Sequence, residues 1–288
     1  MQRPKAVTVG YICADIAALA TCCISLDRED PDNFSSNHNL YTLGEIGPRH
    51  VAIYGGLEEG AIAGPAADMM NTFASIKLLI LVSSKAGAVP GDSGQVRVGD
   101  VVVPTKYVQG QDRDNMKKTD LSQASGLLAT AFTSMGTAQP WVLDEDTATL
   151  MEKKPSWGAK CKRPAGDDMD KLNMIFVRQR KDASLAHHHG VVISDSILPE
   201  DATNRDSVAV PLNLGPIACF DNGETAGLPQ HRKNVDVVPV LGVSHYCDKD
   251  AEKTRRMWGN YASMTAAACA KRIVLGLDNY FDVLEREL

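Results

Sequence analysis

The sequence predicts an α/β fold in which helices cover both faces of a sheet, and two observations carry this prediction. Short apolar segments typical of buried strands alternate with helical patterns along the 288 residues. Near the C-terminal end, the apolar segment Val235–Val243 runs into His245, Cys247 and Asp248, and an Ala-rich helical stretch follows. Open α/β sheets place their chemistry where a strand ends before a helix, so we expect functional side chains there.

The expected strands are short apolar or β-branched segments bounded by polar or turn-forming residues. In chain order they are Val7–Cys13, Leu40–Ile46, His50–Gly55, Leu78–Ser83, Asp100–Pro104, Gly190–Ser194, Ile217–Phe220 and Val235–Val243. The expected helices are Ala61–Phe73, which is rich in small residues, Leu121–Ser134, a segment starting near Glu200, and a last helix from about Glu252 to Glu287. The last helix has an apolar face of Met257, Tyr261, Met264, Ala268, Ile273 and Leu277.

Two polar segments, Lys106–Lys118 and Lys153–Asp170, interrupt this alternation. The first is poor in strand-forming residues, and the second is rich in Lys, Pro, Gly and Asp. Both are typical of surface excursions from one core and not of linkers between domains. With no internal repeat visible, we expect residues 1–288 to form a single domain.

The composition favours a small-molecule partner. A net charge of −6 and a pI near 5.6 provide no electrostatic footprint for nucleic acid or an anionic membrane. No apolar run approaches ~18 residues, and the N-terminal residues lack a convincing signal-peptide pattern. The seven cysteines form no C-x-x-C pair, which is typical of reduced, buried thiols in a cytoplasmic protein.

Four blocks of sequence carry a resemblance to a known family. They are Val9–Ala14, the stretch from Gly60 to Val103 with Arg97, Gly99 and Asp100 in an Arg-x-Gly-Asp-Val-Val-Val phrase, His189–Ser194 with Asp201 and Arg205 downstream, and Gly215–Leu228 followed by Gly242–Lys271. Their order and spacing resemble the nucleoside phosphorylase/nucleosidase superfamily, especially its fungal branch. The resemblance implies a three-layer α/β/α sandwich around a mixed, partly barrel-like sheet. It also implies a homo-oligomer, either a dimer, a trimer or a hexamer.

The chemistry of that family is cleavage of an N-glycosidic bond. An Asp at a strand end helps the purine to leave, and a Glu holds the sugar hydroxyls. The nucleophile is phosphate, held by a Gly-rich loop and Arg, or water activated by a Glu shortly after the first strand. In this sequence Glu224 matches the sugar-holding Glu, and Asp248 matches the second Asp of the last-strand motif.

The sequence departs from that plan at several positions. Ala18 stands where the water-activating Glu is expected, with Asp15 nearby, and His245 replaces the Asp that protonates the base. The loop Ser84–Ala88 has side chains where phosphorolytic members carry glycines, and each added Cβ crowds an anion cradle. Leu198 takes the place of a base-stacking aromatic residue. Together these changes argue against simple phosphorolysis or hydrolysis, although the pocket-forming frame persists.

We therefore expect a repurposed enzyme that performs acid/base tailoring of a small heteroaromatic or polyketide-like metabolite by cyclisation, isomerisation or elimination. In this hypothesis His245 is the acid or base, Asp248 orients it and Glu224 is a polar anchor. The expected substrate contacts are Ser84, Lys85, Gly87, Ser194, Leu198, Phe220, Asp221 and Trp258. N-glycosidic cleavage is the alternative, with water favoured over phosphate as the nucleophile. A catalytically dead nucleoside-binding module is the third possibility.

Two other clusters receive less weight. The run His187–His189 invites a metal site, but consecutive residues of a strand point to alternate faces. Cys247 lies two residues from His245 and shares its face, yet a buried free thiol is the commoner state. With no G-x-G-x-x-G or G-K-[ST] motif after a strand, we expect no cofactor and no metal.

Overall fold

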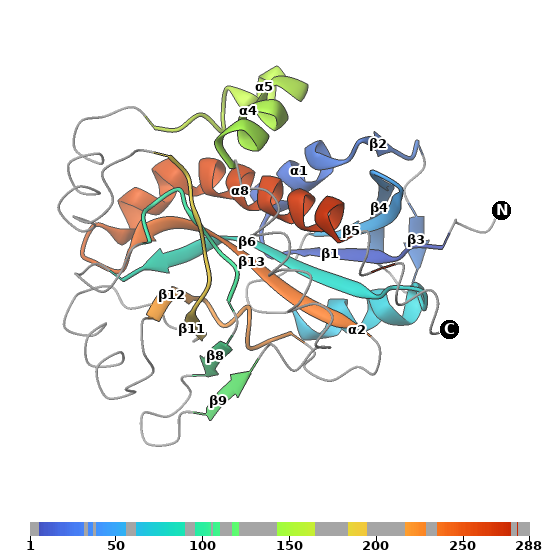
Figure 1. The fold of residues 1–288 in the computed structure, drawn as a ribbon, viewed down its shortest axis with the longest axis horizontal. Helices are drawn as coiled ribbons and strands as arrows, with labels where there is room; N and C mark the ends of the chain where they lie inside the picture. Colours follow the sequence, from blue (N-terminus) through green and yellow to red (C-terminus); the bar gives the residue numbers. More distant parts are fainter. Residues whose placement is uncertain are drawn as a thin grey trace.

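The computed structural model describes residues 6–31, 34–36, 39–55, 62–89, 96–104, 106–109, 117–120, 143–164, 184–194, 217–228, 235–277 and 281. In this part of the chain, strands form one mixed sheet and helices pack on both of its faces (Figure 1). The α/β class predicted from the sequence is confirmed.

The described strands are β1 (Val9–Cys13), β2 (Arg28–Glu29), β3 (Phe34–Ser36), β4 (Asn39–Ile46), β5 (Arg49–Tyr54), β6 (Leu78–Ala88), β7 (Val101–Val102), β8 (Lys106–Gln109), β9 (Lys117–Asp120), β10 (His187–His188), β11 (Val191–Ser194), β12 (Ile217–Asp221) and β13 (Asp236–Tyr246). The described helices are α1 (Ile16–Ser25), α2 (Ala63–Thr72), α4 (Leu143–Lys153), α5 (Pro155–Gly158) and α8 (Ala251–Gly276).

Strand β6 is the centre of the sheet. Its first half lies between β1 and β13 and pairs with both in parallel. Its last residues pair with β12 in the antiparallel sense, and β12 continues through β11 to β8 and β9. On the other side, β1 leads through β5 and β4 to β2. Nearly all of β6 is buried, as its run of Leu, Ile and Val requires in a strand covered on both faces.

Alternation along β1 shows how the two faces are covered. A Cβ on Gly10 would lie 2.5 Å from Sδ of Met69 in α2, so this glycine lets α2 approach the sheet. The next residue, Tyr11, points the other way and is fully buried near Cys22 of α1 and Cys269 of α8. Helices α1 and α8 thus cover one face, and α2 covers the opposite face (Figure 1).

Helix α8 is the main covering element of its face and packs along β13 and β6. Its central residues are almost all buried, and many of them are alanines, which permit close approach of helix and sheet. Its N-terminal end follows β13 after a short loop, which brings its first turns close to the ends of the strands. None of the helices in the described ranges is long and apolar enough to cross a membrane.

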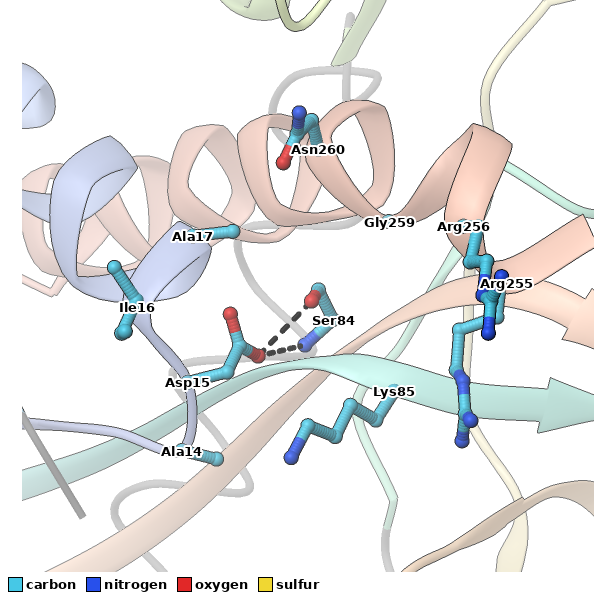
Figure 2. A pocket seen from close by; sticks show the side chains of 10 residues that line it. All are labelled: Ala14, Asp15, Ile16, Ala17, Ser84, Lys85, Arg255, Arg256, Gly259 and Asn260. Atoms are coloured by element: carbon cyan, nitrogen blue, oxygen red, sulfur yellow. Dashed lines mark hydrogen bonds between the residues drawn. The ribbon is translucent and has the colours of Figure 1, made fainter. Parts of the chain in front are cut away.

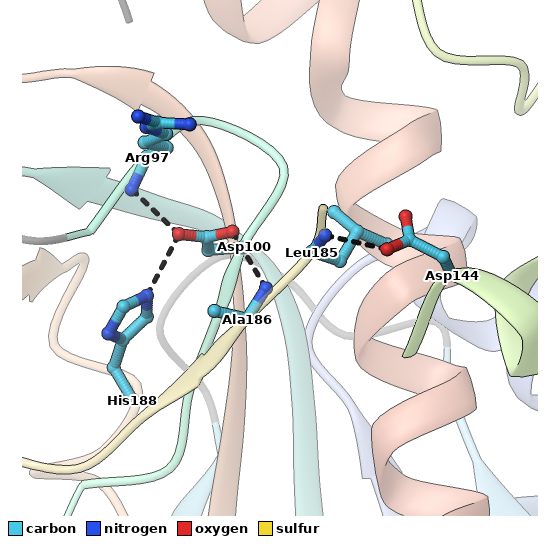
Figure 3. Close-up of polar contacts among 6 residues, drawn as sticks. All are labelled: Arg97, Asp100, Asp144, Leu185, Ala186 and His188. Carbon is cyan, nitrogen blue, oxygen red and sulfur yellow. Dashed lines mark hydrogen bonds and ion pairs between the residues drawn. The ribbon is translucent and has the colours of Figure 1, made fainter. Parts of the chain in front are cut away.

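A buried carboxylate fixes the loop that precedes β7. Asp100 accepts hydrogen bonds from the backbone N–H of Arg97 at 2.9 Å and of Ala186 at 3.0 Å, and Nε2 of His188 lies 2.8 Å from its Oδ2 atom (Figure 3). His188 is therefore a structural partner of Asp100. In the described residues, no group of three or more His, Cys, Asp or Glu side chains is arranged to hold a metal ion.

Several predicted elements change their bounds. Strand β6 extends to Ala88, beyond the expected end at Ser83, because its last residues pair with β12 and β13. The expected helix Ala61–Phe73 is α2, and the last helix is described only to Gly276. The expected helices Leu121–Ser134 and near Glu200 lie outside the described residues.

The expectation that Lys106–Lys118 contains little strand structure is wrong. Strands β8 and β9 form an antiparallel pair there, with Lys106 opposite Asp120 and Gln109 opposite Lys117. Pairing with β11 supports β8, and this long-range contact overrides its weak local strand propensity. Helices α1, α4 and α5 and the short strands β2 and β3 were not expected from the sequence.

Candidate active site

The ends of three strands bring several predicted site residues together. Gly87 of β6 pairs with Phe220 of β12 on one side and with His245 of β13 on the other. Asp221 follows Phe220, and Ser244 precedes His245. Gly87, Phe220 and His245, which the sequence predicts to lie at one site, therefore meet at this junction.

Gly87 is required here because two side chains of β13 lie directly against it. A Cβ at this position would be 2.6 Å from Sγ of Cys247 and 2.8 Å from Nε2 of His245. Cys247 itself packs with Ile193 and Phe220 in a small buried apolar cluster. This packing accounts for Cys247 as a buried thiol, and it fixes the imidazole of His245 above the β6 backbone.

The imidazole of His245 is almost completely buried, with 1% of the residue exposed. Burial and, to a smaller extent, the positive charge of Arg255 lower its pKa to about 4. Nδ1 lies 3.1 Å from Oγ of Ser244. At neutral pH the ring is therefore uncharged.

Asp248 does not occupy the position that the sequence assigned to it. One of its carboxylate oxygens, Oδ1, accepts a hydrogen bond of 2.9 Å from the backbone N–H of Asp250, in the loop before α8. The contact made by Nδ1 of His245 is with Ser244. Nδ1 of His245 thus faces Ser244, and β13 ends at Tyr246, two residues before Asp248.

Glu224 lies in a turn that follows β12. Gly223 has a φ of 72°, in the left-handed region that favours glycine. The N–H of Gly227 donates to the carbonyl of Gly223 at 3.1 Å, and the N–H of Leu228 donates to the carbonyl of Thr225 at 3.2 Å. The turn directs Glu224 into the protein, where only 2% of the residue is exposed.

The carboxyl group of Glu224 is the most perturbed acid at this site. Burial, and next the charge of Asp221, raise its pKa from the ordinary value of 4.5 to about 8. A hydrogen bond from Ser83 and the charge of Lys85 act in the opposite direction but do not cancel the effect. Its Oε2 atom is buried and has no hydrogen-bond partner among the described residues. Glu224 is therefore mostly protonated at pH 7 and holds an unused polar atom.

Ser194 and Asp221 brace the turn that carries Glu224. Asp221 is fully buried and accepts hydrogen bonds from the hydroxyl of Ser194 and from the backbone N–H of Thr225, the latter at 3.2 Å. Ser194 Oγ also accepts from the N–H of Ala226 at 3.0 Å. Burial raises the pKa of Asp221, whereas these hydrogen bonds lower it. Both residues, expected to contact substrate, are bonded within the protein in this structure.

A pocket of about 480 Å³ lies between the start of α1, the end of β6 and the first turns of α8 (Figure 2). Its basic lining residues are Lys85, Arg255 and Arg256. Its other lining residues are Ala14, Asp15, Ile16, Ala17, Ser84, Gly259 and Asn260. Ser84 and Lys85 are thus expected site residues that do line a pocket. Through Lys85 and Arg255, the pocket is electrostatically linked to Glu224 and His245.

Asp15 joins α1 to β6 at the wall of this pocket. Its Oδ1 atom accepts from the N–H of Ala18 at 2.8 Å and so caps the helix, and its Oδ2 atom accepts from the N–H and the hydroxyl of Ser84 at 3.1 and 2.9 Å (Figure 2). Ala18 is fully buried. Position 18, where a water-activating Glu is expected, therefore holds a packed alanine side chain. The neighbouring carboxylate of Asp15 caps α1.

Replacing Asp15 by alanine is expected to lower the free energy of unfolding by about 1–2 kcal/mol, because the cap and both bonds from Ser84 are lost. Urea denaturation measures the effect. Asp250 is the matched control, since it stands at the N-cap of α8 without a side-chain capping bond. A loss in Asp15→Ala no larger than in Asp250→Ala would contradict the assigned role.

Trp258 does not form a wall of the pocket. It is 1% exposed and meets the ring of Tyr261 edge-on, with centroids 5.6 Å apart. A Cβ on Gly99 would lie 3.3 Å from Trp258, which places the indole against the loop before β7. The helical period explains the correction, because the α8 residues that line the pocket are Arg255, Arg256, Gly259 and Asn260. Leu198 lies outside the described residues.

The sequence analysis missed the roles of three residues. Asp15 has the signal of an N-cap, an acidic residue just before a helical run, and this signal was available. Arg255 lies on the same face of α8 as Gly259. The sequence alone does not reveal that this face lines a pocket. Ser244 gave no local signal, because its contact with His245 depends on the backbone at the end of β13.

No protein-family model and no curated protein matches the sequence. Solved structures match over nearly the whole chain. The 5'-methylthioadenosine/S-adenosylhomocysteine nucleosidase of S. pneumoniae is 16% identical, with a TM-score of 0.62 over 94% of this chain and 100% of that one. The corresponding Helicobacter pylori nucleosidase is 11% identical, with a TM-score of 0.61 over 93% and 98%. Futalosine hydrolase of Helicobacter pylori is 10% identical, with a TM-score of 0.60 over 93% and 97%.

These neighbours decide the fold. The chain shares its fold with these nucleosidases and with futalosine hydrolase. The nucleosidase fold explains the mixed sheet centred on β6 and the position of α8 beside the strand ends. At this level of sequence identity, structural similarity supports the architecture alone. The reaction must therefore be argued from the residues at the junction of β6, β12 and β13.

Proposed function

We propose that the chain is a small-molecule enzyme in which Glu224 delivers a proton to its substrate. The observation that carries this proposal is a buried carboxyl group whose Oε2 atom has no hydrogen-bond partner among the described residues. Its pKa of about 8 keeps it protonated at neutral pH, which is the state a general acid needs. Asp221, held by Ser194 and Thr225, supplies the neighbouring negative charge that contributes to this state.

His245 has a different task from the one assigned by the sequence alone. With a pKa of about 4 it is neutral, so it cannot be the main proton donor at pH 7. A hydroxyl hydrogen of Ser244 directed at Nδ1 leaves the ring proton on Nε2, the atom that faces Gly87. In this tautomer the ring donates a hydrogen bond to a substrate oxygen or nitrogen and orients it for protonation by Glu224.

The reaction class that fits this pair is a proton-transfer reaction, namely a cyclisation, isomerisation or elimination on a heteroaromatic or polyketide-like metabolite. Hydrolysis needs a base that activates water, and position 18 carries a buried alanine. Asp15 is used by the α1 cap and by Ser84. Glu224 can give its proton to one substrate atom, and the carboxylate that results can take a proton from another substrate atom, which restores the acid. Such a cycle needs no base at position 18, so the site favours rearrangement over the addition of water.

N-glycosidic cleavage is the second candidate, and the nucleosidase neighbours favour it. In that case a neutral His245 donates a hydrogen bond to the departing base. Glu224 then contacts the sugar hydroxyls, and water is the nucleophile. The buried alanine at position 18 would make this reaction slow.

Product analysis by mass spectrometry separates the two candidates. The protein is incubated with adenosine, inosine, methylthioadenosine, S-adenosylhomocysteine and uridine, with and without phosphate, and separately with a small-molecule extract of source cells in D₂O. With the nucleosides, we expect the unmodified protein to release no more free base than the Glu224→Gln variant does. With the extract, we expect a product that carries solvent deuterium, and we expect it only with the unmodified protein. Release of free base without phosphate would establish the second candidate instead, and a folded protein that changes neither mixture would contradict an enzymatic role.

A further inference from the structure

The pocket beside the proposed catalytic pair is unusually rich in positive charge. Lys85, Arg255 and Arg256 line it, whereas Asp15 is its one carboxylate among the described lining residues. Arg256 forms an ion pair with Glu252 on the exposed surface of α8. The carboxylate of Asp15 accepts hydrogen bonds from Ala18 and Ser84. Basic side chains therefore outnumber acidic ones among the described lining residues.

Two cations from different elements face this space. Lys85 comes from β6 and Arg255 from α8, and in Figure 2 both side chains extend away from Asn260. Among the described residues, the guanidinium of Arg255 has no hydrogen-bond or ion-pair partner in the protein. Lys85 and Arg255 also influence Glu224 and His245, respectively, so an anion between them would lie close to both proposed catalytic groups.

The pocket lining that comes from the start of α1 includes apolar side chains. Ile16, in the first turn of α1, is 75% exposed, which is unusual for so large an aliphatic side chain. Ala14 and Ala17 lie beside it. A volume of about 480 Å³ falls in the range of small-molecule sites. The pocket therefore combines cationic side chains with apolar ones.

We propose that this pocket binds an organic acid, with its carboxylate between Lys85 and Arg255 and its apolar body against Ile16 and Ala17. This inference rests on the proposed function, since it names the class of its substrate. A planar guanidinium and an ammonium group are both strong partners of a carboxylate. Ser84, Ala86 and Ala88 of β6 stand where the resemblance predicts the glycines of a phosphate cradle, so we assign the anion to the substrate and not to a separate phosphate.

Equilibrium binding tests this proposal without any need for turnover. The probes are 2-naphthoate, its neutral isostere 2-naphthamide, and inorganic phosphate, measured by titration calorimetry with the full chain. The variants are Lys85→Met and Arg255→Met. Lys253→Met is the matched control, because it removes an exposed cation from the same helix but not from the pocket lining.

We expect 2-naphthoate to bind at least tenfold more tightly than 2-naphthamide, and each of the two pocket variants to abolish most of that preference. Lys253→Met should leave it unchanged. Equal affinity for acid and amide, an unaltered preference in Arg255→Met, or no binding of either probe at millimolar concentration would overturn the proposal. So would binding of phosphate alone, which would identify an inorganic-anion site. Because binding is measured in the absence of reaction, a failed acid preference is distinguishable from a failure of Glu224 as proton donor.

Discussion

Replacing Glu224 by glutamine is expected to stabilise the protein at pH 8 while it lowers turnover by about 10²–10⁴-fold, the usual contribution of a general acid. Glutamine is close in shape to the protonated carboxyl group and cannot ionise. The buried site that makes Glu224 a proton donor also makes its ionised form unfavourable, so removing the ionisable group removes that cost.

The sign follows from linkage. The pKa of Glu224 is about 8 in the folded protein and near 4.5 in the unfolded chain, so the folded state holds the proton more tightly. The stability that this proton contributes is fully present below pH 4.5 and is lost as the pH rises through 8. At about 1.4 kcal/mol per pKa unit, the unmodified protein should lose about 3 kcal/mol relative to Glu224→Gln between pH 5 and pH 8.

Urea denaturation of both proteins across this pH range measures the difference. His245 is buried in its neutral form, so its own contribution is present above pH 6.5 and is lost toward pH 4, but this contribution is common to both proteins and cancels. Glu152→Gln makes the same chemical change at an exposed position of α4 and should show no such pH dependence. Parallel curves for the unmodified protein and Glu224→Gln would refute the raised pKa and, with it, the proposed acid.

Replacing Gly242 by alanine should prevent stable folding. A Cβ at this position would lie 2.1 Å from the carbonyl oxygen of Ala262 and 2.8 Å from its carbonyl carbon. Both atoms belong to the backbone of α8, so no side chain can move aside, and the helix would have to leave β13. We expect a loss of at least about 3 kcal/mol, above the usual cost of an inserted methyl group in a core.

Gly259→Ala is the matched control because no atom lies within 4 Å of the Cβ it would add. Gly259 is in the same helix α8, where alanine is the better helix former, so a gain of up to about 1 kcal/mol is expected. Denaturant unfolding compares the two variants. A Gly242→Ala protein as stable as the unmodified chain would show that α8 does not pack against β13 as closely as described.

The sequence predicted the positions of residues whose surroundings are determined by a regular strand or helix. Strand β13 and helix α8 have long apolar patterns, and the polar residues after the strand marked the junction where His245 and Gly87 now meet. Glu224 was found because of a family resemblance and a preceding glycine. Its raised pKa was not predictable, because it depends on burial and on the charge of Asp221, opposed by Ser83 and Lys85 from β6.

The failures have a common physical origin. Asp248 was assigned from its match to the second Asp of the last-strand motif, and Trp258 was expected to contact the substrate. The exit angle of β13 and the rotation of α8 decide where they point, and neither follows from local sequence. The Asp15–Ser84 bond joins the first helix to the sixth strand, so no local pattern contains both partners. Strands β8 and β9 exist through pairing with each other and with β11, which outweighs their polar composition.

The central position of β6 has a consequence for how the molecule is made. One of its two long parallel neighbours, β13, comes from the last fifth of the chain, so β6 leaves the ribosome long before this partner has been synthesised. During that interval β1 is the only parallel neighbour of β6 among the described strands that has been synthesised. Contacts between such distant segments close slowly, and the unpaired edge can associate with other chains in the meantime. The pairing of Gly87 with His245 therefore forms only after most of the chain has been made.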